Sequence, residues 1–166
     1  MKKLTYLLFV SVLLLTSCSN DDDATNDVDF DTIGQTFEFT TSFSSTNDFR
    51  QFYTFDQDIF ESDVVLMFRR EGIANGLEVW EPLPTASFFF FNDATGAIEG
   101  FLNYRFNFTI GDVEVILSSD APQLAGPEFT DNQRFRIVIV PSDFAQSTEV
   151  NLSNFNEVSA ALNLAF

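Results

Sequence analysis

The sequence predicts an all-β fold, an antiparallel β-sandwich of about eight strands with a short C-terminal helix. From Gln35 onward, apolar and polar residues alternate with a period of two, the pattern of strands with one buried face. Glycine, proline and asparagine separate the apolar segments, and no helical pattern occurs between them. Phenylalanine, with 22 residues in the chain, is the expected core material.

The most regular strand is expected at residues 102–110. One face carries the apolar side chains of Leu102, Tyr104, Phe106, Phe108 and Ile110. The residues between them are polar, so the apolar face is expected to be buried and the polar face exposed to solvent. A turn at residues 111–112 then predicts a hairpin partner at residues 113–117. A second strand of this kind is expected at residues 35–43.

Two further segments are apolar on both faces and predict central strands. They are residues 64–68 and 135–140, both rich in β-branched side chains. Shorter strands at residues 49–55 and 77–80 extend the set. In the tail, Ser153 is the predicted N-cap of a short helix at residues 154–162, which is expected to cover a sheet edge or a barrel end.

The N-terminus has the pattern of a secretory leader. Lys2 and Lys3 precede an apolar stretch at residues 4–15 that is too short to span a bilayer comfortably. The residues before Cys18 resemble the lipobox of bacterial lipoproteins, which implies cleavage between Ser17 and Cys18 and acylation of the Cys18 sulfur. We therefore expect a signal peptide at residues 1–17, a lipidated tether at 18–34 and a β-sandwich domain at 35–166.

The tether is strongly acidic, with Asp21, Asp22 and Asp23 shortly after the cysteine. This run resembles the export signal that directs Bacteroidota lipoproteins to the outer face of the outer membrane. A solvated, self-repelling linker is the simpler interpretation of the same run. The sequence thus predicts anchoring in the outer membrane through the N-terminal lipid, facing the cell exterior, with an orientation toward the periplasm as the alternative.

Composition excludes several classes of function. Both lysines lie in the leader, so the mature chain has six arginines against 25 acidic residues, a formal charge of −19. Such a field repels nucleic acid, and no nucleic-acid partner is expected. The chain has no histidine, and Cys18 is its only cysteine. Histidine-based triads and histidine-ligated zinc are therefore impossible, and no metal, cofactor or enzyme activity is predicted.

The run Phe88, Phe89, Phe90 and Phe91 is the strongest candidate for a binding surface. In a strand, two of these rings face each side. An exposed pair beside Trp80 and Tyr104 could hold a protein or a glycan. A central strand, or a strand covered by the C-terminal helix, is the favoured alternative and would bury all four rings.

Charged residues recur at two-residue spacing and allow two interpretations. The acidic pairs are Asp56 with Asp58, Glu61 with Asp63, and Asp112 with Glu114. Solvated turns explain them better than calcium or glycosidase chemistry, because no calcium-loop motif is present. Arg134 and Arg136 share a face, and they are expected to pair with Asp112 and Glu114 if the two strands are neighbours.

Three segments of the mature chain match a known pattern. They are residues 63–66, Trp80 followed by Leu83 and Pro84, and residues 132–144. On these residues the chain resembles an uncharacterised family of flavobacterial surface lipoproteins, over about residues 37–162. The resemblance implies a β-domain after a lipid tether. Its motifs are structural and assign no functional residue.

Together these patterns predict a lipid-anchored protein of the cell envelope with a non-catalytic binding or structural role. A protein-interaction module requires an exposed aromatic patch or an open sheet edge. A glycan-binding module instead requires Trp80, Tyr53 or Tyr104 to line a groove. A small glycosidase, the third alternative, requires two carboxylates about 5–9.5 Å apart in one cleft.

Overall fold

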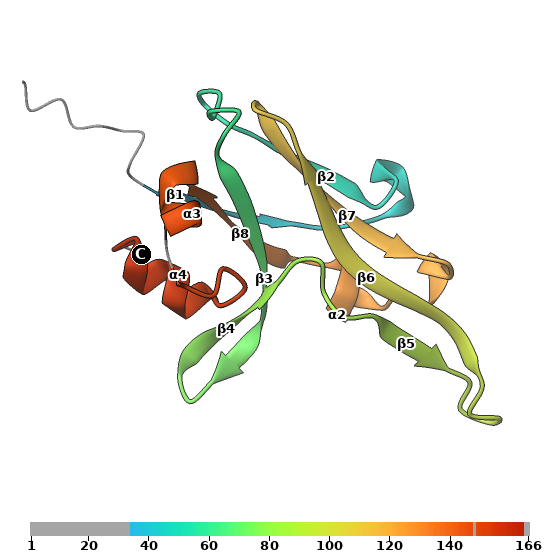
Figure 1. Cartoon of the computed structure of the whole chain (residues 1–166). Helices are drawn as coiled ribbons and strands as arrows, with labels where there is room; N and C mark the ends of the chain where they lie inside the picture. The colour runs from blue at the N-terminus through green and yellow to red at the C-terminus, as the bar shows by residue number, and fades with distance from the viewer. Residues whose placement is uncertain (1–33, 148, 165–166) are drawn as a thin grey trace, which may run out of the picture.

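Residues 34–147 and 149–164, described by a computed structural model, form two antiparallel four-stranded sheets and several short helical segments (Figure 1). This confirms the predicted β-sandwich with a helix near its C-terminus. The strands are β1 (Gln35–Thr41), β2 (Arg50–Thr54), β3 (Val64–Ala74), β4 (Leu77–Pro82), β5 (Phe88–Phe91), β6 (Ile98–Phe108), β7 (Asp112–Ser119) and β8 (Gln133–Val140). The helical segments are η2 (Ser45–Asn47), η3 (Pro122–Leu124), α2 (Pro127–Thr130), α3 (Ser142–Ser147) and α4 (Phe155–Ala161).

The strand order explains the sequence patterns. The first sheet has the order β1-β8-β3-β4 and the second has the order β2-β7-β6-β5. The two segments that are apolar on both faces, β3 and β8, pair at the centre of the first sheet, with Val65 opposite Ile139. The predicted hairpin is β6 with β7, and Tyr104 lies opposite Leu117.

Aromatic rings fill the space between the sheets. Phe135 of β8 lies near the centre of this layer, with ring centroids 5.6 Å from Phe39, 6.0 Å from Phe43 and 5.9 Å from Tyr104. Aliphatic side chains from β3, β6, β7 and β8 complete the layer. Each such aromatic pair adds about 0.5–1.5 kcal/mol to the stabilisation from burial alone.

The outer face of the first sheet carries a second apolar cluster. Phe68, Val138 and Val140 point away from the central layer and are covered by Phe155 and Val158 of α4. The C-terminal helix therefore covers a sheet face rather than the edge or barrel end that the sequence suggested. The reason is that β3 and β8 are apolar on both sides, so their outer face has to be removed from water.

The N-cap of α4 is Asn154, not the predicted Ser153. The Asn154 Oδ1 accepts hydrogen bonds from the backbone N–H groups of Asn156 and Glu157. Its Nδ2 also donates to the Glu157 carboxylate at 2.7 Å. Ser153 lies one residue too early, and its own N–H donates to the Asn151 side chain at 3.1 Å.

This difference in capping gives a direct test. Asn154→Ala should lower the free energy of unfolding by about 1 kcal/mol, because two N–H groups at the start of α4 lose their acceptor. Ser153→Ala, the matched control, should change it by less than about 0.5 kcal/mol. Urea unfolding of the two variants measures both values, and equal losses would show that Asn154 is not the cap.

Candidate functional site

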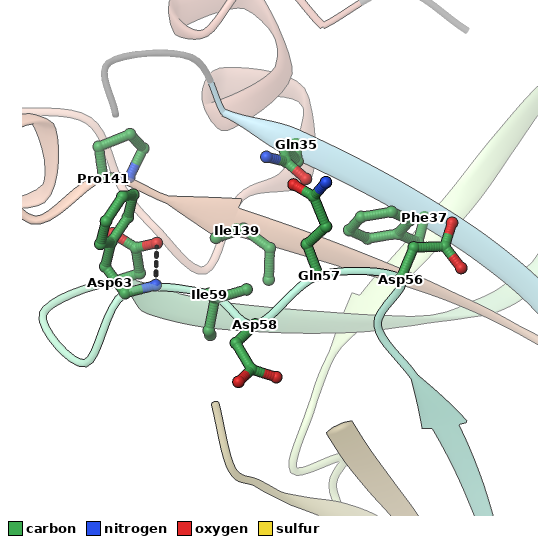
Figure 2. Close-up of a pocket in the computed structure, with 10 residues that line it drawn as sticks. Gln35, Phe37, Asp56, Gln57, Asp58, Ile59, Asp63, Ile139 and Pro141 are labelled. Atoms are coloured by element: carbon green, nitrogen blue, oxygen red, sulfur yellow. Dashed lines mark hydrogen bonds between the residues drawn. The ribbon is translucent and has the colours of Figure 1, made fainter. Parts of the chain in front are cut away.

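A groove of about 440 Å³ lies between the β2–β3 loop, the start of β1 and the end of β8 (Figure 2). Its floor is apolar and includes Phe37, Ile59 and Ile139. Backbone hydrogen bonds hold the loop in place, since Phe55 N–H donates to the Gly111 carbonyl at 2.9 Å and Ile59 N–H to the Ile110 carbonyl at 2.9 Å. The groove is therefore built by the ends of several strands.

Acidic side chains line this groove without converging on one point. Asp56 and Asp58 are exposed, and Figure 2 shows their carboxylates directed to different sides. Asp63 lies beyond Ile59, where one of its carboxylate oxygens accepts the N–H of Phe60 at 3.2 Å. The groove thus has an acidic rim around an apolar floor. It does not bring two of these carboxylates together as a pair.

Trp80, a predicted binding residue, lines a different groove beside α4. The groove also contains Leu77, Asn154 and Phe155. The Arg136 guanidinium lies over the Trp80 ring, 4.0 Å from its centroid, and also 4.3 Å from the centroid of Phe155. Because Arg136 occupies this face of the indole, Trp80 acts in packing of the first sheet against α4.

Tyr104, the second predicted aromatic partner, is fully buried in the central layer. Its hydroxyl donates to the carbonyl of Phe129 in α2 at 2.6 Å. Burial raises the pKa of Tyr104 to about 12, although nearby Arg69 acts in the opposite direction. Tyr53 is also packed in this layer, with its ring 5.5 Å from that of Phe37. Neither tyrosine forms part of a glycan groove.

The phenylalanine run forms β5, a terminal strand of the second sheet. The rings of Phe88 and Phe90 point inward and lie 5.3 and 6.0 Å from that of Phe129. Phe89 and Phe91 are 51% and 58% exposed. The favoured expectation, a central strand or one covered by the C-terminal helix, is therefore wrong. That helix covers the first sheet, and the unpredicted α2 covers only the inward pair of rings.

Two residues that sequence analysis did not single out extend the exposed pair. Phe101 lies opposite Phe89, and Ile98, itself 60% exposed, lies opposite Phe91. We call Phe89, Phe91, Ile98 and Phe101 the aromatic patch. A register shift between Phe90 and Phe91 breaks the period-two pattern here, so the sequence placed the start of β6 at Leu102 instead of Ile98.

The arginines of β8 do not pair with Asp112 and Glu114. That expectation required neighbouring strands, but β7 and β8 lie in different sheets. Arg134 and Arg136 instead bind the carboxylate of Glu38 on β1, where Arg134 Nε lies 2.9 Å from Oε2 and Arg136 Nε lies 2.7 Å from Oε1. Register explains this choice, because Glu38 is directly opposite Arg136.

The Glu38 cluster predicts a pH-dependent contribution to stability. Burial alone would raise the pKa of Glu38, but hydrogen bonds and attraction from Arg136 and Arg134 outweigh it and lower the pKa. A carboxylate with a lowered folded-state pKa stabilises the fold above its unfolded-state pKa, and this stability is lost as the pH falls through the folded value.

Glu38→Gln should therefore lower the free energy of unfolding at pH 7 by about 1.5–3 kcal/mol, since the buried Arg136 loses its charge-assisted hydrogen bonds to Glu38. The difference from the unsubstituted protein should shrink as the pH is lowered below about 4. Urea unfolding at a series of pH values measures it. Glu61→Gln, in an exposed position of the β2–β3 loop, is the control, and an equal loss there would contradict the assignment.

Within residues 34–147 and 149–164, no group of three or more acidic or cysteine side chains is arranged to hold a metal ion. In the same part of the chain, no helix is both long and apolar enough to cross a membrane. The predicted cleavage site at Ser17 and the lipidation site Cys18 lie outside the described residues. Comparison with protein-family models, curated proteins and solved structures finds no match to this chain.

Proposed function

We propose that this protein is a lipid-anchored, non-catalytic module of the cell envelope that binds a protein partner through the open edge of β5. The anchor is supported by the sequence, in which Lys2, Lys3 and an apolar stretch precede Cys18. The binding role is supported by the aromatic patch. The absence of histidine from the chain and of lysine beyond the leader removes the commonest catalytic side chains.

The character of the edge strands is the observation that carries the binding role. Exposed edges of sheets are normally protected by charged residues or proline, because they otherwise pair with other chains. Three of the terminal strands follow this rule: β1 contains Glu38, β2 contains Arg50, and β4 contains Glu78, Glu81 and Pro82. The fourth, β5, consists of four phenylalanines with neither charge nor proline.

The position of this edge suits a protein held at its N-terminus. The described chain begins at Gly34, where a side chain would lie 2.8 Å from Leu162, so this end lies against the C-terminal segment after α4. In Figure 1 the β5–β6 hairpin is on the opposite side of the molecule. Anchoring through Cys18 would therefore leave the aromatic patch far from the attachment point and accessible to a partner.

Anchoring is tested by Cys18→Ala. The unsubstituted protein should take up radiolabelled palmitate, fractionate with the outer membrane and be cleaved by protease added to intact cells. The variant should lose the label and leave the membrane fraction, because no other residue can accept a thioether-linked lipid. Ser19→Ala is the matched control and should keep both properties. Palmitate uptake by the Cys18→Ala protein would contradict the anchor.

Partner binding is tested by photo-crosslinking in cells. A photo-reactive phenylalanine analogue at position 89 or 91 should give a discrete crosslinked product with another protein. The same analogue at position 52 is the matched control, since Phe52 is 62% exposed but lies on β2 beside Arg50. Identical products from all three positions, or none from positions 89 and 91, would contradict a specific binding role for the β5 edge.

A further inference from the structure

The β5–β6 hairpin extends beyond the end of β7, and its two edges differ. Where β7 ends, Ser119 Oγ donates to the Phe101 carbonyl at 2.7 Å, and the Asp120 carboxylate accepts the Phe101 N–H at 2.8 Å. The neighbouring Gly100 packs closely against the same segment, because a side chain there would lie 2.5 Å from the Ala121 Cβ. The β6 edge is therefore closed at Phe101 by groups of the molecule itself, whereas no strand pairs with the outer edge of β5 in the described residues.

The direction of β5 at the open edge is fixed by packing of its inward side chains. Phe88 and Phe90 are held against Phe129, which fixes the direction of the strand and projects Phe89 and Phe91 to the other face. An added strand would hydrogen-bond along β5 and place alternate side chains against the aromatic patch. Those side chains have to be apolar. The remaining side chains would point to the α2 side of β5.

The exposed charges around this edge are acidic, and Arg69, whose guanidinium lies 5.9 Å from the Phe88 ring centroid, is buried. No lysine or arginine occurs between Glu71 and Tyr104. Asp93 and Glu99 are exposed in and beside the hairpin turn, and Glu128 is exposed in α2, next to Phe129. The nearest basic residue along β6, Arg105, lies four positions beyond Phe101 and opposite Ile116. A partner segment is therefore favoured if the side chains that do not contact the patch are basic.

We propose that β5 binds an extended segment of a partner protein by strand addition, and that this segment alternates apolar residues with lysine or arginine. This inference rests on the proposed binding role of the β5 edge and specifies the chemistry of the partner. A second copy of this chain is disfavoured, because both copies would present the same acidic surface around this edge and would repel each other.

The test uses the full-length protein purified from cells and fluorescent synthetic peptides. One peptide alternates lysine with valine, a second alternates glutamate with valine, and a third has the lysines of the first but proline in place of alternate valines. The lysine–valine peptide should bind about tenfold or more tightly than either of the others at about 20 mM salt. The proline peptide should fail because it cannot complete the backbone hydrogen bonds. At about 1 M salt the preference for lysine over glutamate should largely disappear.

Variants separate the edge from a general attraction of cations to an acidic protein. Phe89→Ser with Phe91→Ser should weaken lysine–valine binding about tenfold, whereas Phe52→Ser should leave it unchanged. Asp93→Asn with Glu99→Gln should reduce the lysine preference without removing apolar contacts. Asp56→Asn with Asp58→Asn removes the same charge from the distant groove and should have little effect.

The outcomes distinguish the two proposals. Equal binding of the three peptides, or equal effects of the two charge-removing variants, would overturn the basic-strand partner. A crosslink at position 89 would still support the proposed binding role in that case. Loss of the crosslink would overturn both. Sedimentation of the protein alone covers the remaining alternative: a dimer that Phe89→Ser with Phe91→Ser dissociates would replace the basic partner with a second copy of this chain.

Discussion

Aromatic packing between the two inner sheet faces is the contact on which the rest of this structure depends. The chain has a single cysteine, so no disulfide within one molecule can join the sheets. They are held instead by buried side chains such as Phe135, Tyr104 and Met67, each of which contributes about 1.5–3 kcal/mol or more through burial. Because this layer is filled, ligands can meet the protein only at the ends of the sandwich, its outer faces or its edges.

The arginines are used mainly to build the first sheet. Arg134 and Arg136 bind Glu38, Arg70 binds Glu78 at 2.9 Å, and Arg69 lies 4.5 Å from the centroid of the buried Tyr104 ring. These arginines contact partners within the molecule, and the chain has 25 acidic residues against eight basic ones. The electrostatic potential at the surface is therefore negative, and it is most negative where basic residues are most distant.

The architecture could be predicted from the sequence, because strand positions follow from short-range patterns. Alternation located the strands, and apolar residues on both faces identified β3 and β8 as central. Prediction from the sequence failed where distant contacts decide the outcome. Three features depend on strand order, which no local pattern contains. They are the number of strands that flank β5, the residue that pairs with Arg136, and the sheet face that α4 covers. The start of β6 was missed because the register shift at Phe90 and Phe91 interrupts the alternation.

The sequence identified only part of the aromatic patch, because the patch also depends on contacts between distant residues. Phe89 and Phe91 were candidates, but Trp80 and Tyr104 were grouped with them on sequence alone. The fold separates the three sites, because Trp80 lies under Arg136 on the outer face of the first sheet and Tyr104 lies in the core. Ile98, which completes the patch, is adjacent to Phe91 only through strand pairing.

An uncharged edge strand raises a physical conflict if the protein is anchored to a membrane as proposed. Anchoring confines the copies to a surface, which raises their effective concentration and favours pairing between like edges. The four phenylalanines of β5 would aggravate this tendency. The acids around this edge, Asp93, Glu99 and Glu128, act against it, because each copy carries the same negative charge there. The same acids would attract the basic strand proposed as the partner, so one arrangement of charge would both discourage self-association and favour that partner.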